Sequence, residues 1–254
     1  MKTQLIIWSM IVLLVHNTQA QQTHENAQSI YKIPPELLAG EGLDSIPQQD
    51  TTRTVFQKLV YSGQDLAIFM VAIGTGITNE FKGFPLEEFI FWANGKAVVE
   101  PEGEEPFDVN TGDYFVQAKG FNGKWNFVDI GGVHLELALI AKHRPDSTVT
   151  SSISHAQVLD KDMLSGVTVP ENRKVYEGVE ITVNLINEPS QLINVSQERM
   201  LHVLNGVLTV TGPDAVEQKY YPGDFLVVQE GYQARWSSNS LQQLRVLELY
   251  KTRL

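Results

Sequence analysis

The sequence predicts an all-β protein made of two tandem antiparallel β-barrels. From Val55 onward, short runs rich in Val, Ile, Phe, Tyr and Leu alternate with turns rich in Gly, Asn, Asp and Pro. No long segment has strong helical periodicity, and several blocks of the first half return in the same order in the second half. Short strands separated by such turns are typical of antiparallel sandwiches and barrels, and an internal repeat indicates two copies of one unit.

Three matched blocks carry the repeat: 58–63 with 174–178, 87–95 with 198–206, and 112–117 with 223–228. The third block is followed at matching distances by Gly120 and Trp125 in the first copy and by Gly231 and Trp236 in the second. We therefore predict the following organisation: signal peptide 1–20, N-terminal arm 21–54, first barrel 55–142, linker 143–170 and second barrel 171–254.

The first twenty residues have the pattern of a secretory signal. Lys2 gives a positive start, residues 5–15 are apolar apart from Ser9, and residues 18–20 form a small-x-small cleavage site. The apolar run is too short to span a bilayer, which favours a cleaved signal over an anchor. A secreted or periplasmic location is therefore expected.

The composition narrows the range of partners. The 30 acidic and 19 basic residues give a formal charge of −11, which argues against a nucleic-acid partner and against an anionic membrane surface after signal cleavage. The chain has no cysteine, so disulfides, thiolate metal sites and a cysteine nucleophile are excluded. A small-molecule ligand and possible homo-oligomers remain.

The turns of the two copies carry a family resemblance. Asn94-Gly95 and Asn205-Gly206 are hairpin pairs, and Pro222-Gly223-Asp224 is a tight turn that leads into an apolar strand. From about residue 58 to the carboxyl terminus, these blocks resemble the cupin superfamily. The segment 120–125 is most similar to the group that includes ureidoglycine aminohydrolase-like proteins. The resemblance implies two cupin-type barrels (double-stranded β-helix or jelly roll) and leaves the reaction open.

The resemblance also shows which metal ligands are missing. A metal-binding cupin has a His-x-His pair shortly before a glutamate and a further histidine in the second motif. Glu88 stands at the glutamate position, but residues 81–86 contain no histidine and Gly123 takes the place of the later one. In the second copy, Arg199 and Ala234 occupy the glutamate and histidine positions. We therefore expect neither a metal in the usual site nor any other cofactor.

Strand alternation groups candidate site residues inside the first barrel. If Glu88 points inward, so do Trp92 and Trp125, while His134 and Glu136 share a face on a later strand. Aromatic walls with a few convergent polar groups suit a small polar ligand. Each residue also has an alternative role. The tryptophans could pack in the core, and Glu88 could be a hydrogen-bonded carboxylate at the barrel mouth. His134 and Glu136 could face solvent.

Glu88 and His134 are the candidate catalytic residues, as general acid and base. Trp92, Trp125 and Glu136 are candidate ligand contacts. A smaller metal site built from His134, Glu88 and Glu136 is a further possibility.

The second copy differs in charge. Continuing the repeat spacing matches Arg199 with Glu88 and Arg245 with His134. If both arginines point inward, they would suit an anionic group, with Trp236 as a further ligand contact. Alternatively, this barrel is structural. His202 matches Phe91, on the outward face.

Three functions stay open at this point. The first is an exported binding protein for a small polar metabolite, held in the first barrel. The second is a hydrolase or isomerase that resembles the ureidoglycine enzymes and uses Glu88 and His134. The third is a structural or oligomerisation protein.

Overall fold

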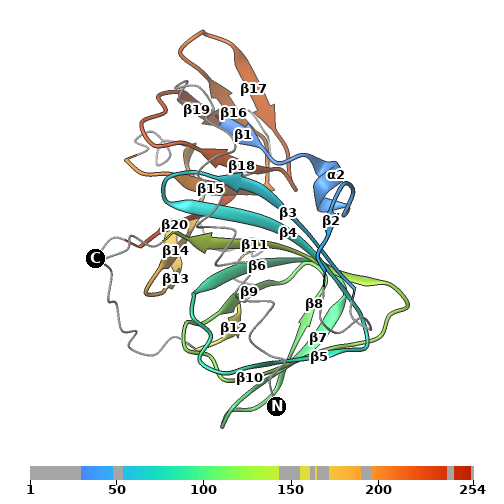
Figure 1. Ribbon diagram of the computed structural model, residues 1–254. Helices are drawn as coiled ribbons and strands as arrows, with labels where there is room; N and C mark the ends of the chain where they lie inside the picture. Colours follow the sequence, from blue (N-terminus) through green and yellow to red (C-terminus); the bar gives the residue numbers. More distant parts are fainter. Residues whose placement is uncertain are drawn as a thin grey trace. The chain divides into compact units, whose positions relative to one another are not determined.

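The computed structural model describes residues 30–47, 54–142, 155–160, 164, 172–189, 196–238 and 243–252. Within these residues the regular secondary structure is nearly all β-strand, and the helix α2 (Pro35–Leu38) is short (Figure 1). No helix in the described part has the length and apolar character needed to cross a membrane. The predicted signal peptide 1–20 and most of the linker lie outside the described residues.

The chain divides into two compact units, each built on a large and a small antiparallel sheet. The first unit holds 36–62 and 67–158, and the second holds 28–35, 63–66 and 159–254. Of the predicted arm 21–54, one short strand belongs to each unit. β1 (Ile30–Lys32) pairs with β18 (Phe225–Val228) in the second unit, and β2 (Asp44–Ser45) pairs with β3 (Val55–Ser62) in the first.

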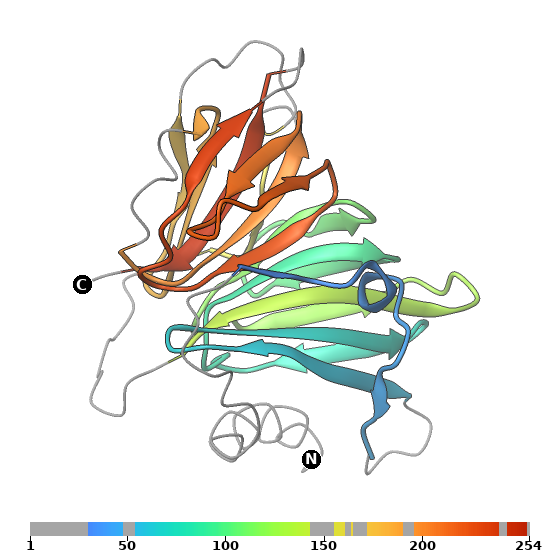
Figure 2. The same cartoon turned by 90° about the horizontal axis from the view of Figure 1, so that it is seen from above.

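The large sheet of the first unit has seven strands, and Figure 2 shows its long strands side by side in teal, green and yellow-green. Their order is β12 (Gln157–Val158), β9 (Tyr114–Gln117), β6 (Glu88–Asn94), β11 (Val133–Ala141), β4 (Leu66–Gly74), β3 and β2. The small sheet has the order β5 (Thr78–Phe81), β10 (Gly123–Phe127), β7 (Lys96–Pro101) and β8 (Phe107–Asn110).

The second unit repeats this plan with six and three strands. Its large sheet has the order β1, β18, β15 (Arg199–Asn205), β20 (Arg245–Lys251), β14 (Ile181–Ile186) and β13 (Arg173–Glu177). The small sheet has the order β17 (Glu217–Tyr220), β16 (Leu208–Thr211) and β19 (Arg235–Ser238). β15 and β20 therefore correspond to β6 and β11 of the first unit.

Each unit encloses its own apolar core, and strand alternation decides which residues reach it. Ile90 and Trp92 of β6 and Ala138 and Ile140 of β11 belong to the first core. Leu201 and Val203 of β15 and Val246 of β20 belong to the second. Side chains two positions away on the same strand point to the same interior. Glu88 and Glu136 therefore face the inside of the first barrel, and Arg199 and Glu248 face the inside of the second.

The two copies differ by one residue in their repeat spacing. Leu135 pairs with Asn94 in the first unit, and Arg245 pairs with Asn205 in the second. Arg245 therefore corresponds to Leu135, and the match of Arg245 with His134 is wrong. In both units the strand pairing shifts by a β-bulge next to these pairs. Matching the two copies by a constant number of residues cannot detect such a bulge.

Candidate functional site

The interior of the first barrel is filled with aromatic side chains. Trp92 and Trp125 are buried, and their ring centroids lie 5.9 Å apart. Phe127 stacks on Trp92 at 6.2 Å, and Phe115 lies edge-on to Trp125 at 5.2 Å. Such rings at 4.5–7 Å stabilise each other beyond the area they bury. Both candidate ligand contacts, Trp92 and Trp125, are thus part of the packed core.

Aromatic rings also occupy the region of the usual cupin metal ligands. Gly123 pairs with Phe81 across β10 and β5, and the ring of Phe81 contacts those of Phe84 and Phe121. A Cβ atom placed on Gly123 would lie 2.4 Å from the carbonyl oxygen of Glu100 and 2.6 Å from the Phe121 ring. A histidine side chain does not fit at residue 123 in this backbone.

The described residues contain no group of three His, Asp or Glu side chains that could hold a metal ion. Glu88, His134 and Glu136, the alternative metal ligands considered from the sequence, do not form such a group either. The residues present therefore do not fit a cupin metal site, in either its usual or its rearranged form.

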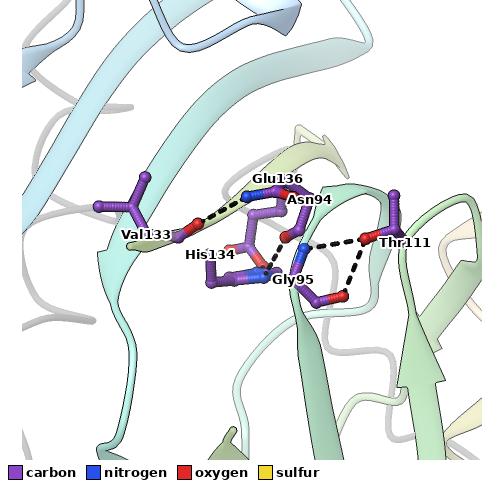
Figure 3. Close-up of polar contacts among 6 residues, drawn as sticks. All are labelled: Asn94, Gly95, Thr111, Val133, His134 and Glu136. Atoms are coloured by element: carbon purple, nitrogen blue, oxygen red, sulfur yellow. Dashed lines mark hydrogen bonds and ion pairs between the residues drawn. The ribbon is translucent and has the colours of Figure 1, made fainter. Parts of the chain in front are cut away.

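His134 and Glu136 form a buried polar pair instead (Figure 3). His134 is fully buried, with its ring centroid 3.9 Å from that of Trp92. Its Nε2 lies 2.8 Å from Oε2 of Glu136, and its Nδ1 lies 2.9 Å from the carbonyl oxygen of Asn94. Gly95 makes this approach possible, since a Cβ there would lie 3.1 Å from Nδ1.

The hydrogen bonds of His134 fix its protons. A carbonyl oxygen can only accept, so Nδ1 must carry a proton and donate it to Asn94. A second proton must lie between Nε2 and the Glu136 carboxyl group, held by one or the other. Both ring nitrogens are therefore engaged, and His134 has none left to accept a proton from a substrate.

Glu88 lies in a different part of the same interior. It is 6% exposed, and burial, followed by the charge of Glu136, raises the pKa of its carboxyl group well above the ordinary value. Its cross-strand neighbour Gln117 is fully buried, and among the described residues neither amide atom of Gln117 has a hydrogen-bond partner. Burial thus favours the uncharged form of Glu88, which lies beside an amide inside the barrel.

The second barrel contains a polar pocket with a volume of about 340 Å³. It lies over the inner faces of the neighbouring strands β13, β14, β15 and β20. Its lining consists of charged, hydroxyl and amide side chains: Glu177, Thr182, Ser196, Gln197, Arg199, Glu248, Tyr250 and Thr252. This volume is at the lower end of the range for small-molecule sites.

A buried ion pair lies at the centre of this pocket. The guanidinium group of Arg199 contacts the carboxylate of Glu248, and both side chains are less than one tenth exposed. Asn184 donates to Oε2 of Glu248 at 3.0 Å and to the hydroxyl of Tyr250 at 3.2 Å. The predicted inward direction of Arg199 agrees with this geometry. However, Glu248 already neutralises the charge that was expected to bind an anion.

The remaining predicted residues of the second copy lie away from this pocket. Arg245 sits between the core residues Leu244 and Val246, so it faces outward and donates to the carbonyl oxygen of Leu164 at 3.0 Å. The predicted inward direction of Arg245 is therefore wrong. Trp236 is buried in the apolar core, and no described residue accepts a hydrogen bond from its indole N–H.

His202 lies on the face opposite to the core, as the repeat predicted, yet it is buried. Its ring stacks on Phe225 at a centroid distance of 3.7 Å. Burial lowers its pKa to about 3, against the opposing effect of Asp224. His202 is therefore neutral at physiological pH.

Sequence reasoning missed Glu248, Tyr250, Gln197 and Asn184. Alternation from Val246 places Glu248 and Tyr250 on the inner face. That signal was hidden because the repeat was extended with Arg245 inward, one residue out of register. Gln197 comes just before β15, where alternation does not apply.

Comparisons with known proteins agree with this architecture. Residues 72–130 match the family described as the EutQ-like cupin domain. No curated protein matches the chain. A putative glyoxylate-induced protein from Pseudomonas aeruginosa superposes with a TM-score of 0.62 at 14% identity, over 90% of this chain and 92% of that one.

Two enzymes share the fold at similarly low sequence identity. Streptomyces albus HEPD, with 2-hydroxyethylphosphonate and Fe(II) bound, has a TM-score of 0.56 at 10% identity, over 89% of this chain and 77% of that one. A mutant of Bacillus subtilis oxalate decarboxylase has a TM-score of 0.50 at 12% identity, over 90% and 78%. The fold defines an all-β protein of two cupin-type barrels, so the predicted fold class is confirmed. Within it, the first barrel carries the EutQ-like match.

Replacing Gly123 tests whether the backbone there excludes a side chain. Gly123→Ala should lower the free energy of unfolding by about 1–3 kcal/mol, because the new methyl group overlaps the Glu100 carbonyl and the Phe121 ring. Gly132→Ala is the matched control, since a Cβ there meets no atom within 4 Å. Urea denaturation of both variants measures the difference. Equal stability of the two variants would contradict the overlap.

Glu88 makes the stability of the protein depend on pH. Its pKa is raised in the folded state, so the folded chain binds this proton more tightly than the unfolded chain does. Stability must then fall as the pH rises above the ordinary glutamate value of 4.5. Glu88→Gln should therefore gain stability relative to the wild type as the pH rises above 4.5. Urea denaturation at a series of pH values, with exposed Glu105→Gln as control, measures the gain. Parallel curves for wild type and Glu88→Gln would refute it.

Proposed function

We propose that this chain is an exported binding protein for a small polar molecule, which it holds without a metal ion in the pocket of the second barrel. The pocket itself supports this proposal most strongly. It combines a volume of about 340 Å³ with a lining of hydroxyl, amide and paired charged groups. Polar groups that converge in a concave site fix the orientation of a small molecule and make its recognition specific.

The sequence favoured the first barrel for the ligand, and one observation keeps that barrel as a second candidate. Both amide atoms of Gln117 and the indole N–H groups of Trp92 and Trp125 are buried without hydrogen-bond partners in the described part of the chain. Native proteins rarely leave buried polar groups unsatisfied. A small ligand or water bonded to these atoms would satisfy them. Against this candidate, the neighbouring aromatic rings pack directly on one another.

The enzyme hypothesis is less well supported. Similarity to ureidoglycine aminohydrolase-like cupins suggested a hydrolase or isomerase with Glu88 and His134 in acid–base roles. Both ring nitrogens of His134 are engaged, by Asn94 and Glu136, and burial opposes the charged form in which Glu88 would act as a base. A structural role in oligomers is compatible with the fold, but it gives no reason for a polar pocket.

The binding proposal is tested by replacing the ion pair as a unit. Removing both partners avoids leaving one buried charge unpaired, so Arg199→Met with Glu248→Leu should fold. Pools of small polar metabolites should raise the Tm of the wild type and leave the Tm of the double variant unchanged. A ligand present at one hundred times its Kd stabilises the folded state by about 2.7 kcal/mol. The response should survive removal of metals by a chelator.

The controls separate the two barrels. Lys96→Met with Asp108→Leu removes an exposed ion pair from the first unit and should respond like the wild type. Gln117→Leu should also keep the response. A response lost in Gln117→Leu but kept in the Arg199/Glu248 variant would move the site to the first barrel. If no pool raises the Tm of the wild type, the binding proposal fails.

Export predicts a defined mature end. When the full chain is expressed in a secreting host, the protein outside the cytoplasm should begin at Gln21, because residues 18–20 form the cleavage site. Amino-terminal sequencing measures this. Intracellular protein that retains Met1 would contradict export.

A further inference from the structure

The lining of the second-barrel pocket carries no uncompensated charge. Its charged side chains are Glu177, Arg199 and Glu248. Arg199 and Glu248 neutralise each other, and Glu177 is exposed and lies 2.6 Å from Lys174. A charged ligand would be transferred from water into this pocket without a partner of opposite charge, and that transfer is costly. The pocket therefore favours a neutral molecule.

The hydrogen bonds within the lining leave defined donors and acceptors for a ligand. The hydroxyl of Thr252 donates to the carbonyl oxygen of Gly178 at 3.2 Å, so the bond of 2.9 Å between Thr182 and Thr252 must be donated by Thr182. The lone pairs of the Thr182 hydroxyl then remain as acceptors. In the same way, the Tyr250 hydroxyl accepts from Asn184 and keeps its own proton to donate.

Gln197 adds a donor and an acceptor at once. Its side chain lines the pocket and is 7% exposed. Its amide oxygen can accept a hydrogen bond and its amide nitrogen can donate two, so a ligand that both donates and accepts would match it. Gln197, Tyr250 and Thr182 thus offer a mixed set of donors and acceptors around one space.

A hydroxyl group matches such a set, because each one donates once and accepts through two lone pairs. An alkyl or purely accepting ligand would leave part of the lining unsatisfied. The pocket volume of about 340 Å³ equals that of roughly eleven water molecules at about 30 Å³ each. It therefore has room for a compact molecule of about that many non-hydrogen atoms.

We propose that the pocket of the second barrel binds a neutral polyhydroxylated molecule, of the size of a monosaccharide or a short polyol, through Gln197, Tyr250 and Thr182. This inference rests on the proposed binding function and names its ligand class. The Arg199–Glu248 pair has a positioning role here, since it fixes Asn184 and, through it, the hydroxyl of Tyr250.

The test compares ligands that share a skeleton and differ in charge. Neutral monosaccharides and polyols, the corresponding sugar acids and the corresponding amino sugars are titrated calorimetrically into the mature protein. At least one neutral member should bind, and its acidic and basic analogues should bind at least tenfold more weakly. Tyr250→Phe should weaken the neutral ligand roughly five- to tenfold, because it removes one donated hydrogen bond. Exposed Tyr221→Phe is the matched control and should bind like the wild type.

Each outcome bears on a different statement. Tight binding of a sugar acid or amino sugar, with no binding of its neutral parent, would overturn the ligand class and leave the binding function intact. Binding of a neutral sugar that Tyr250→Phe does not weaken would overturn the assigned contacts. If no member of the panel binds, the ligand class is wrong, and the metabolite pools decide separately whether the protein binds any small molecule.

Discussion

A charged side chain on the inner face of a closed β-barrel has little water to solvate it, and this constraint governs both halves of the protein. Such a group must be neutral, hydrogen-bonded or paired. The first barrel meets the requirement by raising the pKa of Glu88, which favours its uncharged form, and by joining His134 to Glu136. The second barrel meets it by pairing Arg199 with Glu248. The same physical demand thus produces two chemically different interiors.

The difference between the barrels comes from a few matched positions on equivalent strands. Ala138 and Ile140 of β11 occupy the positions in the first barrel that Glu248 and Tyr250 of β20 occupy in the second, because they pair with equivalent residues of β6 and β15. In the first barrel these positions are apolar, and aromatic rings pack over them. In the second they are polar and, together with Arg199, line a pocket. One backbone plan therefore carries apolar side chains at these positions in one barrel and a polar pocket beside the apolar core in the other.

Local patterns were sufficient to predict the fold. Alternating strands, Asn-Gly turns and repeated blocks depend on neighbours in sequence, and they predicted the two barrels and the inward direction of Glu88 and Arg199. The register beyond a bulge depends on pairing between distant strands, so Arg245 was placed on the wrong face and Glu248 was overlooked. Whether tryptophans line a cavity or fill a core depends on how many side chains meet in space. Alternation along a single strand carries no such information.

The close packing around Gly123 affects how easily evolution could place a metal-binding histidine at this position. The Phe121 ring and the Glu100 carbonyl occupy the space that a side chain at residue 123 would need. A single mutation to histidine would therefore be harmful before it could be useful. Several coordinated changes, in Phe81, Phe121 and the β10 backbone among others, would have to precede any gain in metal affinity. Metal binding in the first barrel is thus more than one substitution away from the present sequence.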